Sequence, residues 1–215
     1  QSQALIMVHG PSGCGKTFLV LDMVLSVASK GTIPDWFGNK VRHGTVVYLA
    51  GEGHHGLRGR VAAWKQHKGV SGLDMWLSRH GLDLNTPQGY QKTVDAIRAL
   101  PNPPEIIVVD TLHRFLDGDE NSASDAKSML DACGAMIHEF DCSVILVHHT
   151  GVSVEAQHRA RGSSAWRGAL DIEISVIPGD TIEINQRKSK DAEEAQSVFV
   201  ELQLVPIKGW LDEDG

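Results

Sequence analysis

The sequence predicts a three-layer α/β fold with a mostly parallel central sheet, helices on both of its faces, and antiparallel strands at the C-terminal end. Four short segments are apolar at successive positions, which is typical of parallel strands buried on both faces. They span residues 4–8, 45–50, 105–110 and 143–147. Three later segments alternate in polarity as antiparallel strands do. They span residues 169–177, 181–186 and 197–205.

Helices are predicted between these strands. Apolar residues recur at helical spacing over 18–24, after Gly53, over 93–100 and over 126–140. Prolines end the third helix, and either of two serines can cap the fourth. The prolines are Pro101, Pro103 and Pro104, and the serines are Ser122 and Ser124. A weaker strand is expected at 75–77, and the polar, basic segment 152–168 predicts a loop.

Size and composition indicate one soluble globular domain. A chain of 215 residues with 41% hydrophobic and 22% charged residues suits a single α/β domain over 1–215, which we expect to be part of a longer polypeptide. No apolar run approaches the roughly 18 to 20 residues of a membrane helix, so no membrane partner is expected. Three cysteines without paired spacing indicate reduced thiols and a cytoplasmic location.

The charges are unevenly distributed. A net charge of −7 argues against a protein coated in positive charge for duplex DNA. Basic residues nevertheless gather at 40–68 and 148–168, whereas acidic residues gather at 117–131, at 193–194 and from Asp212. This segregation permits a basic channel on an acidic body, and a solvated face of mixed charge is the alternative.

The strongest motif is a phosphate-binding loop. Residues 10–17 match GxxxxGK[ST], follow a predicted strand and open a predicted helix. Glycines allow successive backbone N–H groups to converge on phosphate oxygens, and the helix adds the positive end of its dipole. The residues expected to bind the nucleotide are Gly10, Pro11, Ser12, Gly13, Cys14, Gly15, Lys16, Thr17 and Phe18. By analogy with known P-loops, Lys16 would contact the β- and γ-phosphates and Thr17 would hold Mg²⁺.

Two carboxylates at strand ends extend this site. Asp110 ends the most apolar strand, where a Mg²⁺-facing carboxylate belongs, although a strand-end cap is the alternative. Glu52 lies between two glycines after the strand 45–50 and can orient and deprotonate a water, unless it is an ordinary exposed loop residue. His148 and His149 end the next strand and can contact the γ-phosphate. A zinc site with His54 and His55 is the rival, but no spacing in the chain matches a structural zinc template.

Several cations follow late in the chain. NTP hydrolysis usually needs one more positive group on the γ-phosphate, sometimes from a neighbouring subunit. The candidates for such a finger acting in trans are Arg161, Arg187, Lys188 and Lys190. Ordinary surface charge is the alternative for each of them.

This ordered set of motifs resembles the RecA-like ATPase core. More narrowly, residues 44–60, 147–151, 161–171 and 188–191 resemble the RepA-type hexameric replicative helicases of plasmids and phages, a group often labelled AAA-family ATPases. The resemblance covers essentially the whole chain, and the four later motifs are more specific than the P-loop.

The resemblance implies a ring, commonly of six subunits, with ATP and Mg²⁺ at each subunit interface. The residues implied to act in catalysis are Lys16, Glu52, Asp110, His148, Arg161 and Lys188. Thr17 and Asp110 would hold the metal, and a residue at the 148/149 position would couple the γ-phosphate to DNA-contacting loops. The loop 152–164 would face the central channel and contact single-stranded DNA through His158, Arg159 and Ser163. A primase or replication initiator would be a further partner, in a bacterial, plasmid or phage context.

Other functions remain open at this level. The channel loop is poor in the aromatic residues that stack bases, which weakens the nucleic-acid prediction relative to the ATPase prediction. A recombination or repair ATPase that forms filaments would share the fold. A regulatory ATPase that switches protein partners without nucleic acid is the alternative from another class, and a small-molecule kinase fits less well.

Overall fold

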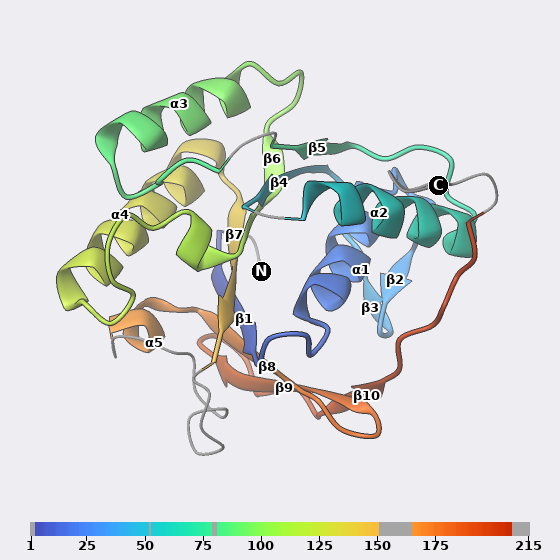
Figure 1. The fold of residues 1–215 in the computed structure, drawn as a ribbon. Coiled ribbons are helices and arrows are strands. Elements are labelled where there is room, and N and C mark those ends of the chain that lie inside the picture. Colours follow the sequence, from blue (N-terminus) through green and yellow to red (C-terminus); the bar gives the residue numbers. More distant parts are fainter. Residues whose placement is uncertain (1–2, 52, 79–80, 151–164, 208–215) are drawn as a thin grey trace.

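The centre of the molecule is an eight-stranded sheet with the strand order β10-β9-β8-β1-β7-β6-β4-β5 (Figure 1). The computed structural model describes residues 3–51, 53–78, 81–150 and 165–207. The strands are β1 Leu5–Gly10, β2 Asp35–Trp36, β3 Asn39–Lys40, β4 Thr45–Ala50, β5 Met75–Leu77, β6 Pro104–Asp110, β7 Ser143–His149, β8 Ile172–Ile177, β9 Ile182–Ser189 and β10 Val198–Val200. The helices are α1 Lys16–Ala28, α2 His54–Lys68, α3 Pro87–Arg98, the short 3₁₀ helix η1 Leu112–Arg114, α4 Ala123–Phe140 and α5 Ala165–Ala169.

The sheet confirms the predicted fold class. Strands β8, β1, β7, β6, β4 and β5 are parallel, whereas β9 and β10 are antiparallel to their neighbours. The segment at β8 differs from the prediction in part, because it pairs in parallel with β1 on one side and antiparallel with β9 on the other. Parallel order brings the carboxyl ends of β1, β4, β6 and β7 to one edge, so residues that end different strands can meet there.

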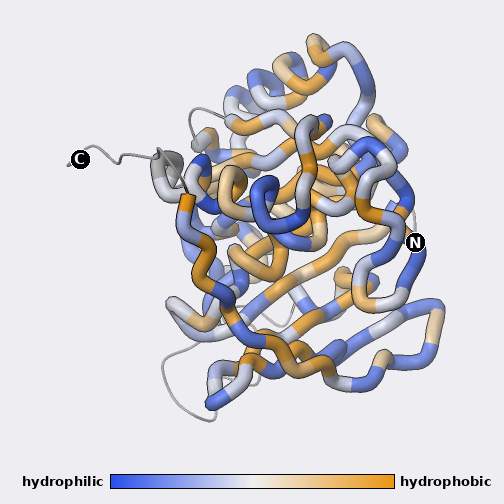
Figure 2. Tube along the Cα trace, turned by 90° about the vertical axis from the view of Figure 1, so that its right-hand side faces the viewer, coloured by the Kyte–Doolittle hydropathy of each residue, from blue (hydrophilic) through white to orange (hydrophobic). Residues whose placement is uncertain are grey.

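Helices cover both faces of the sheet, as predicted. In Figure 1, α3, α4 and α5 lie to the left of the central strands, and α1 and α2 lie to the right. One buried cluster joins α3, α4 and α5 to the sheet, and a second joins α1 and α2 to its other face. Figure 2 shows the central strands mostly in hydrophobic colours and the outer helices in mixed colours. Burial on both faces explains why the parallel strands are continuously apolar.

Several element boundaries differ from the sequence prediction. Helix α3 begins at Pro87, six residues before the predicted start, because the Thr86 side chain accepts a hydrogen bond from the Gly89 N–H and proline is favoured in the first turn. Ser122, one of the two predicted caps, begins α4 by accepting from the Asp125 N–H. Residues 165–168 were predicted as loop and belong to α5, where Trp166 is buried.

The three cysteines are buried free thiols, as predicted. Burial raises the pKa of Cys133 and of Cys142 to about 12, so both behave as inert apolar groups at neutral pH. Within the described part of the chain, no helix combines the length and the hydrophobicity needed to cross a membrane.

Candidate nucleotide site

The P-loop connects the end of β1 to the start of α1. Gly13 and Gly15 have φ angles of 76° and 98°, in the left-handed region that favours glycine. Gly10 is required for a different reason, since a Cβ there would lie 2.3 Å from the Val176 carbonyl oxygen and 2.7 Å from Cys14 Sγ. No side chain caps the start of α1, so its first N–H groups remain available for an anion.

Lys16 is folded onto the loop that precedes it. Its Nζ donates to the Gly10 carbonyl at 2.9 Å and to the Pro11 carbonyl at 2.7 Å, and lies 3.3 Å from His149 Nδ1. The side chain is only 5% exposed. Burial lowers the pKa of the ammonium, and Cys14 and Asp110 partly oppose that shift. A cation held by carbonyls at the mouth of a phosphate loop can transfer to phosphate oxygens with little movement.

Asp110 joins α1 to the sheet at the same edge. Thr17 Oγ1 donates to Asp110 Oδ2 at 3.0 Å, and the Tyr48 hydroxyl donates to the same oxygen at 2.5 Å. The pKa of Tyr48 is raised well above its ordinary value, mainly by burial and further by the Asp110 carboxylate. The hydroxyl therefore stays protonated and acts as a donor. A hydroxyl and a carboxylate side by side form the donor set that Mg²⁺ prefers.

These groups surround a pocket of about 260 Å³ that is open on one side. Phe18 and Arg60 stand at its mouth, and the Arg60 guanidinium carbon lies 4.6 Å from the centroid of the Phe18 ring. Arg60 comes from α2, so the cation–π contact ties α2 to the start of α1. Gly53, at the beginning of α2, lines the same pocket, and the Gly51 N–H donates to the Asp110 carbonyl at 2.7 Å.

The two adjacent histidines face opposite sides of the sheet, because successive strand residues alternate. His149 lines the nucleotide pocket beside Lys16. His148 is 1% exposed and lies on the α5 side, where its Nδ1 is 3.8 Å from Glu120 Oε2 and its ring centroid is 6.4 Å from that of Trp166. The sequence prediction named His148 as the catalytic histidine, and the structure brings His149 to the pocket instead.

The candidate cations of β9, Arg187 and Lys188, and Lys190 just after the strand do not line this pocket. Lys188 Nζ donates to the Arg167 carbonyl at 2.9 Å and to the Leu170 carbonyl at 2.5 Å. Lys190 Nζ pairs with Asp171 Oδ1 at 3.2 Å, and Arg187 Nε donates to the Ser175 hydroxyl at 3.2 Å. No residue of β9 belongs to the described pocket lining.

Part of the predicted site falls outside the residues that the structure describes. These residues are Glu52, His158, Arg159, Arg161 and Ser163. The side chains of His54 and His55, which the rival zinc site would use, are not described either. Among the side chains that the structure does describe, no group of three or more His, Cys, Asp and Glu could hold a metal ion.

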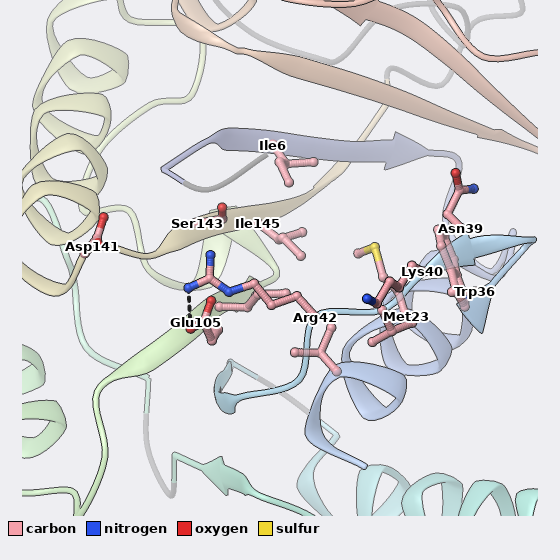
Figure 3. Close-up of a pocket in the computed structure, with 13 residues that line it drawn as sticks. Ile6, Met23, Trp36, Asn39, Lys40, Arg42, Glu105, Asp141, Ser143 and Ile145 are labelled. Atoms are coloured by element: carbon pink, nitrogen blue, oxygen red, sulfur yellow. Dashed lines mark hydrogen bonds and ion pairs between the residues drawn. The ribbon is translucent and has the colours of Figure 1, made fainter. Parts of the chain in front are cut away.

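A larger cavity of about 420 Å³ lies at the opposite edge of the sheet, under the β2–β3 hairpin (Figure 3). Its floor is apolar and is formed by Ile6, Met23, Val27, Ile106 and Ile145. Of the charged groups that line it, Arg42 and Glu105 pair with each other at 3.0 Å, and Asp141 accepts from the Gln3 amide. The P-loop, Lys16 and the Thr17–Asp110 pair, which are the candidate nucleotide-binding groups, line the smaller pocket instead.

Sequence reasoning missed two contributors to the site. Tyr48 carries a hydroxyl in the middle of the apolar buried strand β4, between Val47 and Leu49, and that contrast was the available signal. Arg60 gave no comparable signal, because it is one of several cations on α2 and only the packing of α2 on α1 distinguishes it.

Comparison with protein families agrees with this geometry. A family model described as an AAA domain matches residues 1–155, which is more than half of the chain. The chain belongs to this AAA domain family. Its match spans the P-loop, Asp110 and both histidines.

Solved structures show that this AAA domain has the RecA-like fold. It resembles a solved ATPase domain with a TM-score of 0.64 and 14% identity, over 94% of this chain and 86% of that one. A DnaB-like replicative helicase, described with its interactions with primase, matches with a TM-score of 0.64 and 15% identity, over 94% of this chain and 58% of that one. A KaiC-like protein from Pyrococcus horikoshii OT3 matches with a TM-score of 0.66 and 11% identity, over 94% and 87% of the two chains.

Proposed function

We propose that this AAA domain is an ATP-hydrolysing motor of the replicative helicase type, which acts on single-stranded DNA as a ring with ATP at the subunit interfaces. The observation that carries the proposal is the meeting of Lys16 with the Thr17–Asp110 pair at one open pocket. The similarity of the fold to helicase ATPase domains supports the choice of a helicase-type motor. On the family resemblance we also propose that the ring is a hexamer and that a primase or a replication initiator is its partner.

The residues at the pocket fit a nucleoside triphosphate with Mg²⁺. The uncapped start of α1 and the left-handed glycines leave N–H donors for phosphate oxygens, and Thr17 with Asp110 supplies hard oxygen ligands. A magnesium ion bound there would neutralise charge that develops on the phosphates. Lys16 would leave the loop carbonyls and contact the β- and γ-phosphates.

The other proposed catalytic roles rest on where each residue lies relative to the pocket. Glu52 would orient and deprotonate the attacking water, since its neighbours Gly51 and Gly53 contact Asp110 and the pocket. His149 would sense the γ-phosphate, because it reaches Lys16 within 3.3 Å and His148 faces the other side of the sheet. One of the cations Arg161, Arg187, Lys188 and Lys190 would act in trans. The 152–164 loop would contact DNA through His158, Arg159 and Ser163.

The Phe18–Arg60 pair extends the proposal to the base of the nucleotide. Arg60 packs over Phe18 at the pocket mouth and presents a planar guanidinium. Guanidinium planes and aromatic rings both stack on bases. We therefore assign the pair as a platform for the base.

The proposal is tested by measuring ATPase turnover against single-stranded DNA at two protein concentrations. We expect turnover per subunit to rise with DNA and with protein concentration, because catalysis requires a neighbour, and we expect Lys16→Ala to lose about 100-fold or more. Turnover that ignores DNA would contradict the motor and favour a regulatory ATPase. Filaments rather than rings in negative-stain images with ATP would favour a recombination ATPase.

A further inference from the structure

Helix α2 packs on the core through a small number of apolar side chains. It lies beside α1, in contact with it (Figure 1). Among the α2 side chains that the structure describes, Leu57 alone is buried, and Val61 and Trp64 pack partly buried against the same cluster. These three residues form one stripe at helical spacing. A helix with few buried apolar contacts is weakly held against sliding and rotation, so polar contacts can decide where α2 lies on α1.

The Asp22 carboxylate of α1 makes such polar contacts with two other elements. Its Oδ1 accepts a hydrogen bond from the Trp64 indole N–H of α2 at 2.7 Å, and its Oδ2 accepts one from the Trp36 indole N–H of β2 at 2.8 Å. Lys68 Nζ of α2 lies 4.0 Å from Oδ1, and such partly exposed ion pairs contribute little. Hydrogen bonds to a charged acceptor are stronger than those between neutral groups. One carboxylate therefore ties both α2 and the β2–β3 hairpin to α1.

The contact between Phe18 and Arg60 lies one helical turn closer to the nucleotide pocket. Phe18 is four residues before Asp22 on α1. Arg60 is likewise four residues before Trp64 on α2, and its guanidinium carbon lies 4.6 Å from the Phe18 ring centroid. Four residues advance a helix by about 6 Å, so the two contacts are separated by the same length on both helices. The register of α2 that satisfies the Trp64 hydrogen bond is therefore also the register that brings Arg60 over Phe18.

We infer that Asp22 is a positioning residue of the nucleotide site. Through Trp64 it sets the register of α2, and this register holds Arg60 over Phe18 at the pocket mouth. A slip of α2 by one residue would move the helix about 1.5 Å along its axis and turn it by about 100°, which would break both contacts together. Asp22 does not belong to the described lining of the pocket, so it acts on a bound nucleotide only through α2.

This inference rests on the proposed function in one respect, because Arg60 matters for affinity only if a base stacks at the pocket mouth. The seating of α2 by the Trp64 hydrogen bond does not depend on any ligand. Affinity for nucleotide and hydrogen exchange without nucleotide therefore separate a failure of the inference from a failure of the proposed base platform.

The two indoles that share the carboxylate provide a matched pair of variants. Trp64→Phe and Trp36→Phe each remove one N–H donor from Asp22, but only Trp64→Phe releases α2. Calorimetry compares a non-hydrolysable ATP analogue with inorganic tripolyphosphate, which has no base, each with Mg²⁺. We expect Trp64→Phe to weaken binding of the analogue at least about fivefold and binding of tripolyphosphate less than about twofold, because only the stacking of the base is lost. Trp36→Phe should leave both affinities within about twofold of the parent protein.

Two further variants show whether the effect passes from Asp22 to Arg60. Asp22→Ala removes the shared acceptor and should reproduce the loss of analogue affinity seen in Trp64→Phe. In an Arg60→Ala background, Trp64→Phe should cause no further loss, because residues that act through one contact are not additive. Additive losses, equal effects of the two tryptophan variants, or equal losses for the analogue and tripolyphosphate would each overturn the inference.

Hydrogen exchange of the α2 backbone decides the remaining case, in which Arg60→Ala leaves the analogue affinity unchanged and the base platform is wrong. Without nucleotide, Trp64→Phe should speed exchange of the α2 amides at least about tenfold, because a hydrogen bond to a charged group is lost from the helix. Trp36→Phe should leave this exchange unchanged. If the α2 amides exchange at the same rate in the two variants, Asp22 does not seat α2 and the inference is overturned, whichever ligand the pocket takes.

Discussion

The hydrogen bond from Tyr48 to Asp110 is the most sharply testable contact of the candidate site. Tyr48 is 1% exposed, and its hydroxyl and that of Thr17 donate to the same carboxylate oxygen. Tyr48→Phe removes one donor and keeps the ring. A hydrogen bond to a charged group contributes about 1.5–3 kcal/mol to stability, so we expect the free energy of unfolding to fall by that amount. The Thr17 bond at 3.0 Å remains, which is why Asp110 should stay in place and the fold should survive.

Urea denaturation measures this loss, and the chain offers a matched control in its other tyrosine. Within the described ranges the Tyr90 hydroxyl makes no hydrogen bond, so Tyr90→Phe should change stability by no more than about 0.5 kcal/mol. A second assay follows the Mg²⁺ concentration that half-saturates ATP hydrolysis. This concentration should rise about 10- to 100-fold in Tyr48→Phe, because the hydroxyl orients the Asp110 carboxylate that we propose as the metal ligand. If Tyr48→Phe matched Tyr90→Phe in both assays, the reasoning about this contact would be refuted.

Three further predictions follow from the same geometry. His149→Ala should lower ATP hydrolysis at least about tenfold with stability unchanged, whereas His148→Ala should cost about 1–3 kcal/mol in a urea melt, and the opposite pattern would reverse the assignment. Arg60→Ala should weaken binding of a non-hydrolysable ATP analogue by about 1–3 kcal/mol in calorimetry, whereas Arg58→Ala should not, and equal effects would exclude base stacking. His9 Nε2 lies 3.1 Å from Glu173 Oε1, and the hydrogen bond from His9 lowers the pKa of the Glu173 carboxyl from its usual 4.5 despite burial. The stabilisation from this carboxylate is therefore complete above about pH 4.5 and is lost as the pH falls through the lowered pKa. Glu173→Gln should therefore be less stable than the parent protein at pH 7, with a difference that shrinks on acidification below about pH 4.5, and a difference independent of pH would contradict the assignment.

The parts of the site that the sequence predicted are those fixed by local spacing. The P-loop is one continuous stretch between a strand and a helix, and Asp110 ends an apolar strand, so both could be placed without knowledge of the sheet. The fold class followed for the same reason, because continuous and alternating apolar patterns depend only on which faces of a strand are buried. The shift of the α3 start to Pro87 has a local cause as well, and the Thr86-Pro87 pair was a usable signal.

The choice between His148 and His149 could not be made locally. Both residues end β7, and which of them faces α1 depends on the register of β7 against β1, where His149 pairs with Gly10 and His148 pairs with His9. A shift by one residue would exchange their faces. The contributions of Tyr48 and Arg60 are of the same kind, because each depends on an element that meets the site only after the sheet has assembled.

The proposed trans-acting cations Lys188, in β9, and Lys190, just after it, differ in the contacts that each would have to break. Lys188 donates to two backbone carbonyls at the end of α5, and leaving them would remove two hydrogen bonds from that helix terminus. Lys190 is engaged by a pair with Asp171 in which its side chain is 63% exposed, and such pairs contribute only about 0–1 kcal/mol. Reaching a neighbouring subunit's nucleotide therefore costs Lys190 less than Lys188, even though the family resemblance pointed to Lys188 for catalysis. On this ground we expect Lys188 to fasten α5 to β9 within its own subunit, so that Lys188→Ala would loosen α5 before it affected hydrolysis.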